Sequence, residues 1–137
     1  MTSIINASPT NGIVQTADGS GVMKLQSNGV TTNALAWVNF NGTGTVAIRS
    51  SYNVSSITDN GTGDYTVNFT TALSDANYSA TGFAWASSKN CCAIFLGPKA
   101  TSTNPETTTS IRVATRDNVS ETLLYDADVV NVTIHGN

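Results

Sequence analysis

Few residues of this chain have the types and spacing that catalysis or metal binding requires. Asp59 and Asp64 flank one turn, and Asp126 and Asp128 are two positions apart. Two carboxylates on one strand face could act as a general acid/base pair or bind Ca²⁺. Aspartate is also common at turn edges because it caps turns, and the spacing matches no EF-hand loop. We predict neither a catalytic pair nor a metal site from these residues.

The remaining reactive side chains are one histidine and two adjacent cysteines. A Ser-His-Asp triad would have to use His135, which stands beside Gly136, and the chain has no Gly-x-Ser-x-Gly elbow. We interpret His135 as a solvent-facing strand residue. Cys91 and Cys92 would point to opposite faces of a strand, so we expect two free thiols, and no second Cys or His pair has zinc spacing. The sequence therefore predicts a protein that is not an enzyme and has no cofactor.

Binding chemistry could come from aromatic rings or from polar loops. Rings could form a sugar-stacking platform, but their place in alternating strands predicts core packing for most of them. The longest expected loop, residues 97–109, contains no aromatic residue. Polar loop residues are equally good candidates for a receptor-facing surface. The aromatic residues are Trp37, Tyr52, Tyr65, Phe69, Tyr78, Phe83 and Trp85, and the loop candidates are Lys89, Asn90, Lys99 and Asn104.

Composition limits both the fold and the partners. The chain has 21 Thr, 15 Ser and 15 Asn but only two Glu and three Lys, so we expect little or no helix. A net charge of −3 without any basic cluster argues against a nucleic-acid partner. Met1 is followed by polar residues rather than by a signal-peptide pattern, and no apolar run reaches transmembrane length. We expect no membrane insertion.

The elements that must position these residues are β-hairpins. The sequence Asn-Gly-Thr-Gly occurs twice, at 41–44 and 60–63, each time between alternating apolar and polar residues. Asn-Gly in that setting predicts a hairpin with a type I′ turn. Neither copy is followed by a helical pattern or by a Lys-Ser/Thr pair, so we reject a phosphate-binding loop.

Further strands follow from alternation and from turn residues. Their spacing predicts an all-β chain, folded as an antiparallel β-sandwich or a jelly-roll-like domain over residues 34–137. Residues 1–33 are polar with short apolar pairs, so we expect an extended N-terminal arm or docking segment made of short ribbons. We expect strands over 35–40, 45–48, 52–57, 65–70, 78–86, 91–96, 109–115 and 129–135, and an edge strand or helical turn over 121–125.

One segment carries a family resemblance. AWVNFNGTG, SYNVSSITDNGTGDYTVNF and ANYSATG follow one another from Ala36 to about Ala84. In this order they resemble a module of tail-fibre and related structural proteins of tailed bacteriophages. The leader before residue 30 and the ending VVNVTIHGN resemble such proteins more loosely. Residues 97–128 match nothing in that family.

The resemblance implies a non-enzymatic protein of the virion surface, made in the host bacterial cytoplasm and assembled as a homotrimer. It implies a short tail fibre or receptor-binding component, whose partners are other virion proteins and a host surface receptor or glycan. A capsid decoration (cement) protein or head fibre that stabilises the capsid is the alternative. In either case we expect the arm to dock on the particle through Ile4, Ile5, Ile13 and Val14.

Overall fold

The computed structural model describes residues 26–27, 30–31, 33–87, 92–96, 105–117 and 123–136. Within these ranges the chain is all β, as composition predicts, and no helix there is long and apolar enough to cross a membrane. The strands are β1 (Gln26–Ser27), β2 (Val30–Thr31), β3 (Ala36–Asn41), β4 (Ala47–Tyr52), β5 (Val54–Gly61), β6 (Asp64–Phe69), β7 (Ser79–Trp85), β8 (Cys92–Leu96), β9 (Ser110–Asp117) and β10 (Val129–His135).

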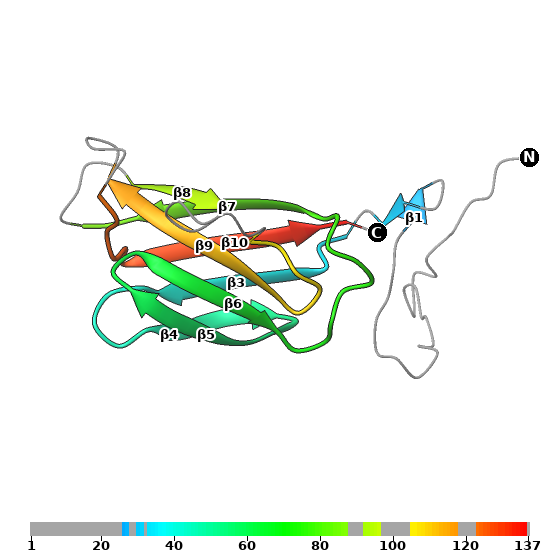
Figure 1. The fold of residues 1–137 in the computed structure, drawn as a ribbon, viewed down its shortest axis with the longest axis horizontal. Helices are drawn as coiled ribbons and strands as arrows, with labels where there is room; N and C mark the ends of the chain where they lie inside the picture. Colours follow the sequence, from blue (N-terminus) through cyan, green and yellow to red (C-terminus); the bar gives the residue numbers. More distant parts are fainter. Residues whose placement is uncertain are drawn as a thin grey trace, which may run out of the picture.

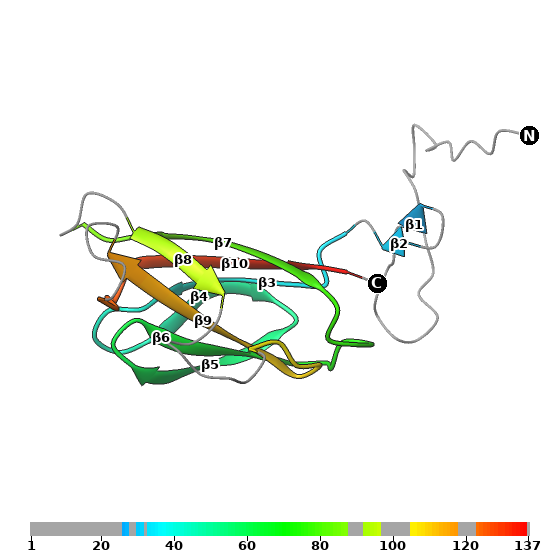
Figure 2. The same cartoon turned by 45° about the horizontal axis from the view of Figure 1, so that its top comes forward.

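Eight of these strands form one antiparallel sheet in the order β4-β3-β10-β7-β8-β9-β6-β5. The sheet folds over itself, so that β4-β3-β10-β7 forms one layer and β8-β9-β6-β5 the other (Figures 1 and 2). The expected antiparallel sandwich is therefore confirmed. The order contains two overlapping Greek keys, because β10 returns to lie beside β7 and β9 lies beside β6.

The core lies between the layers and follows the period of two that strands impose. In β3, Ala36, Val38 and Phe40 are buried while Trp37 is exposed. Phe40 packs edge to face against Tyr65 of the other layer, with ring centroids 5.2 Å apart. The largest fully buried side chains are Tyr65, Phe40, Ile111, Ile134, Val38, Val67, Val113, Val130, Val132 and Thr115.

Strand β7 shows where core prediction fails. Its small side chains face inward, with Ala84 fully buried, whereas Phe83 and Trp85 face outward and are 56% and 46% exposed. Core packing was the expectation for most of the seven aromatic residues, and it is wrong, because these two and also Trp37 and Tyr52 are exposed. Strand parity accounts for this, because Ala84 pairs with the buried Val130 and faces the core, so its neighbours Phe83 and Trp85 take the outer face.

The two Asn-Gly-Thr-Gly segments form the predicted hairpin turns, joining β3 to β4 and β5 to β6. The predicted turn type is wrong, because positive φ occurs at Gly61 and at the last glycine of each copy, Gly44 and Gly63, not at the asparagines. The one non-glycine residue with positive φ in the described ranges is Asn53, the single residue between β4 and β5. Its φ of 53° turns the chain from one layer into the other.

The sandwich has two distinct ends. We call the end with the Asn-Gly-Thr-Gly turns the turn end, and the opposite end, where residues 33–35 enter β3, the arm end (Figure 1). The last strand, β10, also ends at the arm end, where the Leu35 N–H donates to the carbonyl of Ile134 at 2.8 Å. Before residue 33 the described residues form a two-stranded ribbon, β1-β2.

The docking candidates of the arm and the segment 121–125 are described to different extents. The docking candidates Ile4, Ile5, Ile13 and Val14 lie outside the described residues. Of the expected edge strand or helical turn over 121–125, residues 123–125 are described, and they contribute one isolated bridge, between Arg116 and Leu124.

Candidate functional site

The loop residues that sequence analysis favours for receptor contact lie outside the described residues. Lys89 and Asn90 belong to the connection between β7 and β8, and Lys99 and Asn104 belong to the connection between β8 and β9. Cys91 is also outside the described residues. Cys92 opens β8 opposite Ala84.

The aspartates that were weighed as catalytic or metal-binding candidates each form a hydrogen bond or an ion pair within the fold. Asp64 forms a bidentate ion pair with Arg112, with Nε–Oδ1 and Nη2–Oδ2 distances of 2.8 and 2.6 Å, and this pair raises the pKa of Arg112. Asp59 accepts the Gly61 N–H within its own turn. Asp128 accepts the Ser87 N–H at 2.6 Å, and this bond lowers the pKa of its carboxyl group. Nowhere in the described ranges do three acidic, His or Cys side chains gather as a metal site.

Asp126 has the most constrained surroundings of these carboxylates. Its Oδ1 accepts the backbone N–H of Gly63 at 2.6 Å and lies 2.8 Å from the hydroxyl of Tyr65. That hydroxyl also lies 3.0 Å from the carbonyl of Gly42, so its proton is shared between two acceptors. Gly42 and Gly63 belong to the two copies of the repeated turn. We call Gly42, Gly63, Tyr65, Thr115 and Asp126 the turn clamp, because they tie both turns to one segment.

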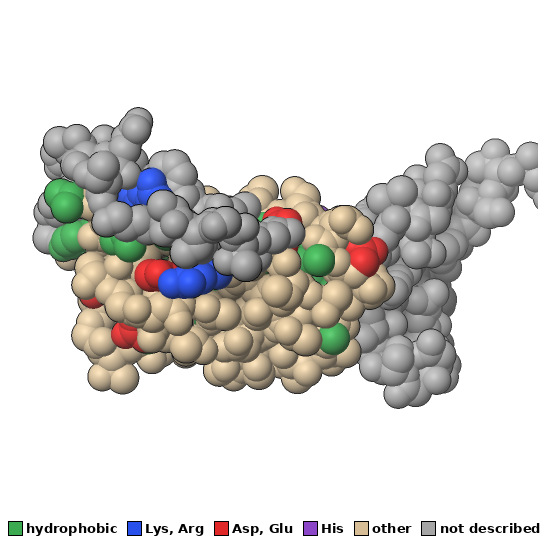
Figure 3. Space-filling model, in the orientation of Figure 1, with side chains coloured by type: hydrophobic (Ala, Val, Ile, Leu, Met, Phe, Trp, Pro, Cys, Tyr) green, Lys and Arg blue, Asp and Glu red, His purple; other side chains and the backbone are tan. Residues whose placement is uncertain are grey.

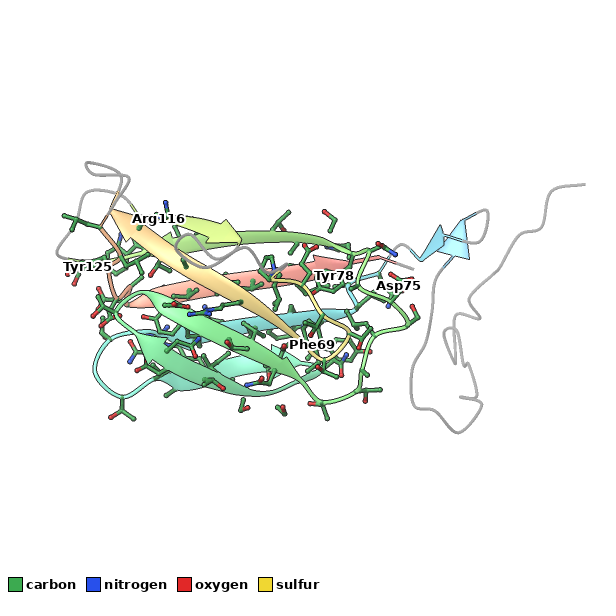
Figure 4. The ribbon with its side chains drawn as sticks, in the orientation of Figure 1. Phe69, Asp75, Tyr78, Arg116 and Tyr125 are labelled. Carbon is green, nitrogen blue, oxygen red and sulfur yellow. The ribbon has the colours of Figure 1, made fainter. Side chains whose placement is uncertain are left out.

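Backbone bonds complete the turn clamp. The N–H of Gly42 donates to Ala127, the N–H of Thr115 donates to Gly63, and Thr115 exchanges further bonds with Tyr125. Arg116 and Tyr125 lie together at this end, whereas Phe69 and Tyr78 lie toward the arm end (Figure 4). Burial, reinforced by the Asp126 carboxylate, raises the pKa of Tyr65. The Tyr65 hydroxyl therefore stays protonated, and it already bonds to Asp126 and Gly42. We interpret the turn clamp as a structural cluster that stabilises the two turns.

His135 ends β10 on its outer side and is exposed, as the sequence predicts. It pairs across the sheet with Ser79 of β7. Asp126, the best-held carboxylate, lies at the turn end, whereas His135 lies at the arm end. Asp126 and His135 therefore do not belong to one site.

The most unusual surface of the described residues is the outer face of β4-β3-β10-β7. Five large apolar side chains are exposed in the described ranges, and four of them are Trp37, Tyr52, Phe83 and Trp85. Strand parity places these four on this one outer face: Trp37 is opposite Tyr52, and Phe83 is opposite Asn131. We call these four residues, together with Asn39 and Asn131, the aromatic face.

Two asparagines form the centre of the aromatic face. Asn39 of β3 and Asn131 of β10 are directly opposite each other, and Nδ2 of Asn39 donates to Oδ1 of Asn131 at 2.7 Å. Sequence reasoning missed this face because the apolar run around Trp37 hides the strand parity. The alternation in β7 could have revealed it: Ala80, Gly82 and Ala84 share one side of the strand, and if that side faces the core, Phe83 and Trp85 must face outward.

The outer face of the other layer is different in kind. Ser, Thr and Asn side chains there bond to one another across strands, as when Asn68 donates to Ser56 and Thr58 at 3.1 and 3.0 Å. Asn60 likewise donates to Thr66 at 2.9 Å. Viewed from the side of β6 and β9, most of the described surface carries neither hydrophobic nor charged side chains, with a few groups of each kind (Figure 3). Its polar groups are satisfied within the sheet, so this face is a solvated surface.

Comparisons with known proteins do not test the resemblance of Ala36–Ala84 to phage structural modules. No protein-family model, no curated protein and no solved structure matches this chain. The resemblance therefore stays a prediction from the residues, and function has to be proposed from the site.

Proposed function

We propose that this chain is a non-enzymatic structural protein of a tailed-bacteriophage particle, most simply a short tail fibre or receptor-binding component on the virion surface. The observation that carries a binding role is the aromatic face, where Trp37, Tyr52, Phe83 and Trp85 stand exposed on one sheet. Exposed rings gathered on one face are typical of interaction sites rather than of solvated surface. The assignment to a phage particle rests on the resemblance of residues 36–84.

The two-ended shape of the sandwich supports an attachment role. The chain enters β3 and leaves β10 at the arm end, while the turn clamp braces the opposite end (Figure 1). Under this proposal residues 1–33 dock on other virion proteins and the sandwich projects away from the particle. Three copies associate around a common axis, and synthesis takes place in the host bacterial cytoplasm.

A capsid decoration protein or head fibre is the second candidate, and the same polarity favours it. An arm leaving from one end could dock on the capsid lattice as well as on a tail. Tail components are present in few copies because the tail has low symmetry, whereas decoration proteins occupy the many equivalent positions of a capsid. The number of copies per particle therefore separates the two placements.

The test is quantitative mass spectrometry of purified particles of the phage that encodes this chain. A few dozen copies or fewer support the tail placement, and hundreds of copies support the capsid placement. Absence of the protein from purified particles contradicts both. Deletion of residues 1–33 should abolish incorporation while the remaining domain stays folded by circular dichroism, and normal incorporation of that variant would contradict the docking role of the arm.

A further inference from the structure

The aromatic face combines stacking surfaces with open hydrogen-bonding groups. The bond from Asn39 to Asn131 uses one N–H and one carbonyl oxygen. It leaves the side-chain N–H groups of Asn131 and the carbonyl oxygen of Asn39 with no other partner in the described part of the chain. An amide pair of this kind presents both donors and acceptors to a ligand.

The spacing of the rings around this pair is set by the sheet. Trp37 and Tyr52 are neighbours on β3 and β4, and Phe83 and Trp85 are two residues apart on β7. Two strand spacings and two residues along the strand separate Trp37 from Phe83, which is about 12 Å at about 4.8 Å between strands and about 3.4 Å per residue. Asn39 and Asn131 lie between them. The face therefore offers two stacking positions joined by a polar centre.

Charge is nearly absent from this surface. Arg49, the cation of β4, turns its guanidinium onto the carbonyls of Phe40 and Asp128 at 3.1 and 2.6 Å. Around the Asn39–Asn131 pair the face carries Ser, Thr and aromatic side chains, such as Ser50, Thr81 and Thr133, while His135 lies at its arm-end margin. A strongly charged ligand would find no counter-charge in the centre of this face.

The size of the face selects a small occupant. Four strands of six or seven residues present an outer face of about 400 Å². A stable protein interface needs about 800 Å² from each partner. The face is therefore too small to hold a second copy of the chain by itself. It fits a ligand that has apolar faces to stack on rings and hydroxyl groups to bond the amides.

We propose that the aromatic face binds a neutral oligosaccharide, whose sugar rings stack on Trp37 and Phe83 and whose hydroxyl groups bond Asn39 and Asn131. This inference rests on the proposed attachment function, for which it names the ligand class and the surface. Stacking supplies affinity, since rings bury large areas, and the amide pair supplies orientation.

The chain's own fluorescence provides the first readout. Its only two tryptophans are Trp37 and Trp85, and both belong to the aromatic face. The full chain is applied to an array of neutral, sialylated and sulfated oligosaccharides. The best neutral glycan is then titrated while tryptophan emission and acrylamide quenching are recorded. Bound sugar is expected to shift the emission and to protect Trp37 from the quencher.

Variants decide whether the face is responsible. Trp37→Ser and Phe83→Ser should each weaken glycan binding by about tenfold or more, as expected when a stacking partner is lost. Leu123→Ser is the matched control, because Leu123 is the fifth exposed large apolar side chain and lies outside these strands. It should bind as the wild type does.

Three outcomes overturn the inference: no neutral glycan on the array binds, the charged glycans bind in preference, or Trp37→Ser and Phe83→Ser bind as well as the wild type. A change of oligomeric state in these variants by analytical ultracentrifugation, with no effect on glycan binding, would instead make the face a subunit interface. Each of these results leaves the proposed virion function open, because incorporation into particles is measured separately.

Discussion

At the residue scale, the repeated Asn-Gly-Thr-Gly turn has two copies with unequal surroundings. A Cβ added at Gly63 would lie 2.5 Å from the Tyr125 nitrogen and 2.7 Å from the Thr115 oxygen. At Gly44, the equivalent position of the other copy, a Cβ would meet nothing within 4 Å. Both glycines have nearly the same positive φ, 64° and 62°. The identical sequence thus serves as an exposed turn in one place and as a packed part of the clamp in the other.

This pair gives a matched prediction. Gly44→Ala should lower the free energy of unfolding by about 1 kcal/mol, the cost of placing a side chain at positive φ. Gly63→Ala should cost about 3 kcal/mol or more, because the same φ penalty is joined by overlap with backbone that cannot move freely. Urea denaturation of both variants measures the difference. Equal losses would mean that the clamp does not constrain the second turn.

The buried tyrosines predict how stability depends on pH. Burial, with the nearby Glu106 charge, raises the pKa of Tyr78 to about 12, and burial also raises the pKa of Tyr65. Between pH 10 and 12 the unfolded chain loses these phenol protons while the folded chain keeps them. Stability should therefore be constant with respect to these groups below pH 10 and fall above it, by up to about 1.4 kcal/mol per pH unit for each tyrosine.

Denaturation measured at intervals from pH 8 to 12 checks this dependence. Tyr78→Phe should remove about half of the alkaline slope attributable to the two tyrosines, because phenylalanine has no proton to lose. If the variant and the wild type lose stability in parallel over this range, the raised pKa of Tyr78 is not linked to folding.

At the element scale, strand positions were largely predictable and strand faces were not. Alternation in Asp64–Phe69 and in Val129–His135 identifies the strands and their buried sides correctly. In β7 the rule that large apolar side chains face inward fails, because Ala84 takes the buried side and leaves Phe83 and Trp85 exposed. The turn clamp was also beyond prediction, since it joins residues as far apart as Tyr65 and Asp126.

The corner at Asn53 carries the chain from β4 in one layer to β5 in the other. Its side-chain amide donates to the carbonyls of Leu35 and Thr71 at 3.1 and 3.2 Å and accepts the Thr71 N–H at 2.8 Å. One side chain thus fixes both its own positive φ and the segments on either side of the corner. Asparagine suits this position because it tolerates left-handed backbone and bonds to nearby backbone groups.

Two substitutions separate these contributions. Asn53→Gly keeps the backbone conformation accessible but removes the three hydrogen bonds, and we expect a loss of about 2 kcal/mol in unfolding free energy. Asn53→Ala adds the cost of positive φ and should lose about 1 kcal/mol more. The two variants are compared by thermal and urea denaturation. A glycine variant as stable as the wild type would show that the side-chain bonds do not hold the corner.

At the scale of the whole molecule, the sandwich has two unlike outer faces and two unlike ends. One outer face satisfies its polar groups internally, as in the bonds from Asn68 to Ser56 and Thr58. The other presents four exposed rings around the Asn39–Asn131 pair. One end receives the chain's N-terminal segment, and the other is braced by the clamp. This asymmetry suits a protein held at one end that binds a ligand through one side.

The central claim is that the aromatic face is the attachment surface of a virion protein. The most direct test is the adsorption rate of phage particles that carry the Trp37→Ser, Phe83→Ser double variant. Particles carrying Leu123→Ser serve as the control, and copy number per particle is measured for both. We predict adsorption reduced by about tenfold or more for the double variant at unchanged copy number, with the control like the wild type. Wild-type adsorption by particles that contain the full number of double-variant copies would contradict the account.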